Sequence, residues 1–104
     1  MTRFEIITNQ SVEADLLEVL DEACPGIYYT LLPGILGRGR QGVRRGDPIW
    51  PERNALVIIY TETPEEGDAI LRAVRALKKH FPREGIKLFA CEVEPVPVIP
   101  DVEV

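Results

Sequence analysis

Apolar residues follow two different periodicities along the chain, which predicts a mixture of strands and helices. Short runs rich in β-branched and aromatic residues predict four strands, at 3–8, 27–32, 55–60 and 86–93. In 12–23 and 64–81, apolar residues instead recur every three or four positions, as on one face of a helix. Pro25-Gly26 and Pro82 are expected to end these two helices. The predicted order is therefore strand–helix–strand–strand–helix–strand.

Both helices have a recognisable start signal. Ser11 is the predicted N-cap of the first helix. Thr63 is the predicted N-cap of the second, with Pro64 at the first helical position and Glu66 closing a capping box. These signals fix where each apolar face begins.

The order βαββαβ is that of ferredoxin-like α+β folds. Such a fold places two helices on one face of a four-stranded antiparallel sheet. Here a long loop, 33–54, separates the second and third predicted strands, which makes them a long β-hairpin. We expect one domain at 1–94, followed by an extended proline-rich tail at 95–104.

The strands predict that both faces of the sheet are apolar. Leu56, Ile58 and Tyr60 point one way, and Val57 and Ile59 point the other. In the last strand, Leu88 and Ala90 likewise oppose Phe89 and Cys91. Two helices can cover only one face, and soluble monomers avoid a large exposed apolar patch. We therefore expect a homo-oligomer that buries the second face.

The loop 33–54 differs from the rest of the chain in composition. Its 22 residues include five glycines and five arginines, and its net charge is +3 inside a chain of net charge −5. Long loops in compact domains are often functional, and guanidinium groups offer forked donors for phosphate or carboxylate. The loop is predicted to recognise an anion or to dock a partner, against the alternative of a solvated hairpin tip. Trp50 is expected to pack the end of this loop against the rest of the domain.

Composition excludes several classes of protein. At 45% hydrophobic and 28% charged residues the chain is ordinary globular material. Its acidic balance argues against general nucleic-acid binding. No apolar run is long enough to cross a bilayer, and the N-terminus lacks a signal-peptide pattern, so we expect a cytoplasmic protein that is not embedded in a membrane.

The cysteines and the histidine give little indication of a metal or redox site. Cys24 and Cys91 have no CxxC spacing and are expected to be small, reduced core residues, with a disulfide or a metal pair as the alternative. His80 is the only histidine, which argues against a His-based metal site within one subunit. No nucleophile–base–orienter set is apparent, so no catalytic residue is predicted.

The stretch Gly26–Gly42, GIYYTLLPGILGRGRQG, resembles the second strand and loop entry of PII-like signalling proteins. In that family a strand leads to a Gly-x-Gly-Arg-Gln segment at the base of a long T-loop. The end of the domain, EGIKLFACEVE, is similar to the family's last strand, with Gly85-Ile86-Lys87 before it. The residues matching the T-loop base are Gly37, Arg38, Gly39, Arg40 and Gln41.

The resemblance implies a non-enzymatic regulator that acts as a homotrimer. It implies adenine nucleotides, or another small anionic effector, bound in clefts between subunits by the residues of the T-loop base and Lys87. It also implies a T-loop that contacts a protein target such as a transporter or an enzyme, here with Arg44, Arg45 and Trp50. The chain departs from the pattern in its short 81–85 loop and its short T-loop, which favours a divergent member.

Three alternatives remain open at this stage. A metal-binding trimer of the CutA kind shares the fold, as does a small ferredoxin-like enzyme with its substrate between sheet and helices. The enzyme needs a polar residue among the apolar strand positions. RNA binding on the sheet would need exposed aromatic residues in an RRM-type signature, which is absent.

Overall fold

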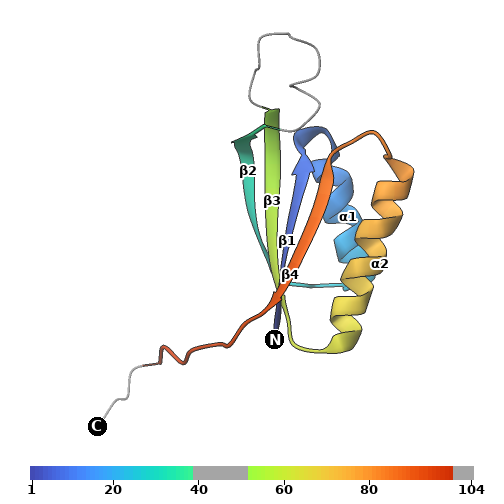
Figure 1. Cartoon of the computed structure of the whole chain (residues 1–104). Coiled ribbons are helices and arrows are strands. Elements are labelled where there is room, and N and C mark those ends of the chain that lie inside the picture. Colours follow the sequence, from blue (N-terminus) through green and yellow to red (C-terminus); the bar gives the residue numbers. More distant parts are fainter. Residues whose placement is uncertain (39–51, 100–104) are drawn as a thin grey trace.

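The computed structural model of the chain describes residues 1–38 and 52–99 (Figure 1). Its elements follow the predicted order. They are β1 (Thr2–Asn9), the 3-10 helix η1 (Gln10–Val12), α1 (Glu13–Ala23), β2 (Tyr29–Gly37), β3 (Glu52–Thr61), α2 (Pro64–His80) and β4 (Ile86–Glu92).

The four strands form one antiparallel sheet in the order β2-β3-β1-β4, so β2 and β4 are its edges. Figure 1 shows α1 and α2 together on one side of this sheet. The predicted ferredoxin-like α+β fold is therefore confirmed.

The core lies between the sheet and the two helices. Alternate residues of β1 and β3 are buried against the helices, as strand geometry requires. The helices contribute the apolar faces that their sequence periodicity predicts, and neither is long and apolar enough to cross a membrane. The buried core residues of the four elements are Phe4, Ile6, Val57, Ile59, Leu16, Leu20, Ile70, Val74 and Leu77.

The β2–β3 hairpin extends further toward its tip than the sequence predicts. The second strand begins at Tyr29, two residues later than expected, and continues to Gly37. Its pairing with β3 shifts register between Leu32 and Ile35, because Pro33 and Gly34 form a bulge there. Gly34 has a φ of +64°, which only glycine adopts at low cost. Because of this bulge, β2 continues past Pro33, where the sequence predicts its end.

One of the two helix starts is as predicted. The amide of Glu66 donates to Thr63 Oγ1 at 3.2 Å, and the Thr63 amide donates to Glu66 Oε1 at 3.2 Å, which completes the capping box. The prediction for Ser11 is wrong. Ser11 lies inside η1, which Asn9 caps, and α1 begins after Val12 without a side-chain cap. The Ser11 hydroxyl instead donates to Glu84 Oε2 at 3.2 Å.

Thr63→Ala is expected to destabilise the protein more than Ser11→Ala. Loss of an N-cap side chain costs about 1 kcal/mol, and exposed residues outside such motifs usually change stability by less than about 0.5 kcal/mol. For a domain of this size about 1 kcal/mol corresponds to a drop in Tm of roughly 4–8 °C. Thermal melts of both variants test this, and equal shifts would contradict the assignment of the caps.

Candidate ligand-binding site

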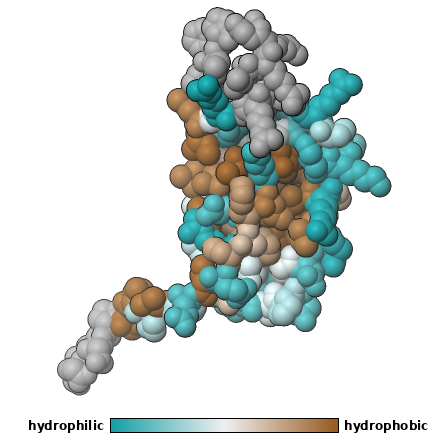
Figure 2. Space-filling view, viewed as in Figure 1, coloured by the Kyte–Doolittle hydropathy of each residue, from teal (hydrophilic) through white to brown (hydrophobic). Residues whose placement is uncertain are grey.

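The face of the sheet that points away from the helices is largely apolar, as predicted. Ile7, Leu56 and Ile58 are half-buried there, and Tyr60 and Phe89 are 49% and 53% exposed. Figure 2 shows apolar residues gathered over the strands, beside polar residues. We call this surface the open face. It offers an apolar contact area that the described part of the chain leaves uncovered.

One ion pair lies on the open face. Arg3 Nη2 is 2.9 Å from Glu5 Oε2, and the Arg3 guanidinium lies over the Tyr60 ring, 5.9 Å from its centroid. Arg3 Nε is buried and has no hydrogen-bond acceptor within the described residues. Beside the pair is a shallow hollow of about 190 Å³, lined in part by Phe89 and Cys91. An acceptor from another chain would satisfy the Nε–H group.

The structure places three of the predicted ligand-binding residues. Gly37 ends β2, Arg38 follows it with an exposed side chain, and Lys87 lies exposed on β4. The other predicted contact residues lie outside the described residues. They are Gly39, Arg40 and Gln41 of the ligand set, and Arg44, Arg45 and Trp50 of the partner-binding loop.

These residues stand at opposite edges of the sheet. β2 and β4 are separated by β3 and β1, so three strand spacings, about 14 Å, lie between them. Lys87 pairs with Ile7 on the central strand β1, and Gly37 pairs with Glu52 of β3. A site that uses both Arg38 and Lys87 would therefore have to span one sheet or join two chains.

The glycine at position 37 has a local structural role. A Cβ built there would collide with the side-chain amide of Asn54 on β3. The pattern of the sequence did not indicate this contact, because it depends on the register of the hairpin after the bulge. A larger residue at position 37 would require the Asn54 side chain to move.

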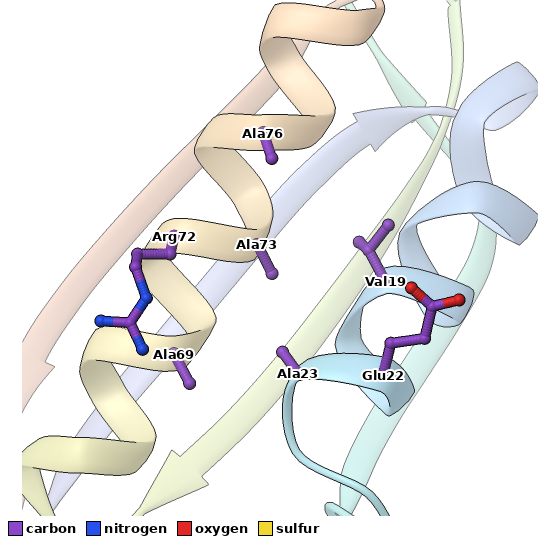
Figure 3. Close-up of a pocket in the computed structure, with 7 residues that line it drawn as sticks. All are labelled: Val19, Glu22, Ala23, Ala69, Arg72, Ala73 and Ala76. Atoms are coloured by element: carbon purple, nitrogen blue, oxygen red, sulfur yellow. The ribbon is translucent and has the colours of Figure 1, made fainter.

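A groove of about 380 Å³ lies between α1 and α2. Its walls are Val19 and Ala23 of α1 and a row of alanines on α2. Glu22 and Arg72 lie at its rim and point away from one another (Figure 3). The alanines at 69, 73 and 76 are the sequence signal for it. The groove offers an apolar floor and no converging polar groups.

The enzyme alternative needs a polar group between sheet and helices, and the described residues place two buried hydroxyls there. Thr8 Oγ1 donates to the carbonyl of Asn9 at 3.2 Å, and Thr61 Oγ1 donates to that of Thr2 at 3.5 Å. Backbone carbonyls thus satisfy both. Across the described ranges no cluster of His, Cys, Asp or Glu side chains is arranged to hold a metal ion.

Both cysteines are free thiols in different surroundings. Cys24 is half-buried at the end of α1. The prediction that Cys91 is a core residue is wrong, because its pairing with Arg3 places it exposed on the open face. Burial and the nearby Glu66 carboxylate raise the pKa of the Cys24 thiol, and Arg72 partly offsets this.

Alkylation of Cys24 is therefore expected to need a higher pH in the folded protein than in urea. A raised pKa keeps the thiol protonated at neutral pH, and the thiolate is the reactive form. Iodoacetamide labelling as a function of pH, read at Cys24 by mass spectrometry, measures the midpoint. A midpoint at or below the value in urea would contradict the assignment.

Comparison with known proteins finds solved structures whose fold is similar to that of this chain. No protein-family model matches the sequence, and no curated protein matches it. The solved structure of CPII from Thiomonas intermedia K12 bound to ADP and bicarbonate is 20% identical, with a TM-score of 0.63 over 86% of this chain and 82% of that one.

Two further structures agree. CPII, a nitrogen regulatory PII-like protein, bound to ADP, AMP and bicarbonate, matches with 15% identity and a TM-score of 0.67 over 94% of each chain. A PII-like signalling protein from Thermus thermophilus matches with 23% identity and a TM-score of 0.52, over 86% of this chain and 82% of that one. This chain therefore has the fold of PII-like proteins.

Proposed function

We propose that this protein is a divergent PII-like regulator, without enzymatic activity. It binds an adenine nucleotide in clefts between the subunits of a homotrimer and contacts a partner protein through its basic loop. The observation that carries the proposal is the placement of Arg38 and Lys87 at opposite edges of a PII-like sheet. A neighbouring chain would supply the second cation beside either edge.

The open face supports the assembly. Ile7, Leu56 and Ile58 form an apolar strip, with Tyr60 and Phe89 exposed beside it. Burying such a strip against other copies removes apolar surface from water, which is the main favourable term in association. The buried Nε–H group of Arg3 would find an acceptor in the same contact. The open face is thus suited to a second and third copy of the chain.

The ligand chemistry follows from the exposed cations. A guanidinium binds phosphate oxygens through two parallel hydrogen bonds, and an ammonium binds them as a point charge. Arg38 and Lys87 are both exposed and form no ion pair within the described residues. The similar CPII structures hold ADP with bicarbonate, and ADP with AMP and bicarbonate. ADP is accordingly the first nucleotide to test.

The charge distribution supports a regulatory role for the loop. Residues 33–54 carry +3 within a chain of net charge −5. A basic loop on an otherwise acidic protein favours an acidic surface on the partner. Opposite electrostatic potentials attract the two proteins and orient them as they meet. The partner in this proposal is a transporter or an enzyme whose docking surface is acidic.

Thermal shift with ADP, AMP, bicarbonate, 2-oxoglutarate and divalent metals tests this function. A ligand at about 100 times its Kd should stabilise the folded protein by about 2.7 kcal/mol. We expect stabilisation by ADP or AMP and none by metal ions alone. Stabilisation by a metal and not by any nucleotide would favour the CutA-like alternative and contradict the proposal.

A further inference from the structure

The segment Pro95–Ile99 exposes several aliphatic side chains. Val93 N donates to Met1 O at 2.9 Å, and the chain then leaves the sheet. Figure 1 shows the segment running away from the strands and helices. Val96, Val98 and Ile99 are 76%, 86% and 85% exposed. Exposed aliphatic side chains are stabilised by contact with another surface, because the contact removes them from water.

Pro95 and Pro97 leave only one side of the segment able to form the backbone hydrogen bonds of a sheet. Successive residues of an extended chain turn their N–H groups to opposite sides. Pro95 and Pro97 have no N–H group, so both missing donors fall on the same side. Val96 and Val98 turn their N–H and C=O groups to the other side. The segment can therefore join the edge of a sheet as a last strand, with prolines facing outward.

The edge strand β2 offers a matching site at Tyr29–Leu32. β2 pairs with β3 on one side, and its other side faces no strand in the described part of the chain. Edges are usually protected by charges, prolines or bulges, but the bulge of β2 comes only at Pro33-Gly34. These four uncharged residues match Pro95–Val98 in length.

The other edge, β4, is a poorer site for the segment. β4 carries Lys87 and Glu92, so charged side chains flank its edge. Pro95–Ile99 itself carries no charge, so it offers no partner to these charged side chains. Charge therefore favours β2.

The segment cannot reach β2 of its own chain. It begins after β4, and β2 lies at the opposite edge, about 14 Å across the sheet. Only Val93 and Glu94 lie between β4 and Pro95, and three extended residue steps span at most about 11 Å, which is less than this width. The β2 edge that the segment can use belongs to another copy.

We propose that Pro95–Ile99 of one chain adds to the β2 edge of a second copy at Tyr29–Leu32, as a strap that locks the assembly. The strap rests on the assembly of the proposed function, and it assigns to this segment a role in holding neighbouring subunits together. Val96 and Val98 make the backbone hydrogen bonds, and Ile99 makes none on the paired side.

Hydrogen exchange of the full-length protein, at a concentration where it is assembled, tests the strap. The amides of Val96 and Val98 should exchange slowly and that of Ile99 rapidly. The amides within Tyr29–Leu32 that do not bond to β3 should also be protected. Dilution to the monomer should remove the protection of all of these amides together. Exchange at Val96 and Val98 as fast as at Ile99 in the assembled protein would overturn the strap.

Proline substitutions give a matched pair of variants. Val96→Pro with Val98→Pro removes both donors on the paired side and keeps the chain extended. Ile99→Pro removes a donor on the other side. Sedimentation should show the double variant dissociating at roughly tenfold higher concentration or more, because two hydrogen bonds per chain are lost. Ile99→Pro should behave as the wild type, and equal behaviour of the two variants would overturn the strap.

ADP titration of the wild type separates this proposal from the proposed function. An assembled wild type that binds ADP but exchanges rapidly at Val96 and Val98 would overturn the strap alone. A monomeric wild type that binds no ADP would overturn both.

Discussion

Ile58→Glu is expected to give a folded monomer, whereas Ile59→Glu is expected to unfold the protein. The two residues are neighbours on β3 and face opposite sides of the sheet. Ile59 is fully buried against the helices, and Ile58 lies on the open face. A carboxylate in the core costs several kcal/mol, against a typical domain stability of about 5–15 kcal/mol. The same carboxylate on the open face meets water once the copies separate.

Circular dichroism melts and sedimentation equilibrium measure both effects. We expect a cooperative melt and the mass of one chain for Ile58→Glu, and no cooperative melt for Ile59→Glu. Phe89→Glu, also on the open face, should repeat the first result. An Ile58→Glu variant that stays assembled would show that the open face is not the contact between copies.

Arg38→Ala is expected to weaken ADP binding by roughly 1.5–3 kcal/mol, the range for hydrogen bonds to charged groups. This is about 10- to 150-fold in Kd. Arg38→Lys should recover part of the loss, because an ammonium cannot reproduce a bidentate fork. Arg40→Ala and Gln41→Ala should act in the same direction. Stability should stay within about 0.5 kcal/mol, since Arg38 is exposed.

Lys87→Ala tests the other wall of the same cleft, and Lys79→Ala is its control. Both lysines are exposed, but Lys79 lies on α2, outside the proposed site. Calorimetric titration should show weaker binding for Lys87→Ala and wild-type binding for Lys79→Ala. Unchanged affinity for both Arg38→Ala and Lys87→Ala would move the site elsewhere. A decrease in Tm that parallels the decrease in affinity would indicate that these residues have a structural role.

Periodicity alone predicts the order of elements, the faces of both helices and the two apolar sides of the sheet. These features depend on side chains that recur along one strand or one helix, as with Ile58 and Ile59. The capping box at Thr63 was also readable, because its partners are three residues apart. Such local patterns predict the folded structure correctly where no contact between distant residues competes with them.

The features that the sequence did not predict depend on contacts between distant residues. Ser11 bonds to Glu84, 73 positions away, and a 3-10 turn capped by Asn9 takes the place of the expected N-cap. The bulge at Pro33-Gly34 and the contact of Gly37 with Asn54 arise from the register of the hairpin. The separation of Arg38 from Lys87 follows from strand order, which sequence spacing does not reveal.

The most direct measurement is an ADP titration of the wild type and of the Ile58→Glu variant under identical conditions. The proposed site lies between chains, because its cations stand at opposite edges of one sheet. The wild type is expected to bind one ADP per chain, and a folded Ile58→Glu monomer is expected to bind none. Equal binding by both, or no binding of ADP by the assembled wild type, would contradict a nucleotide site between subunits.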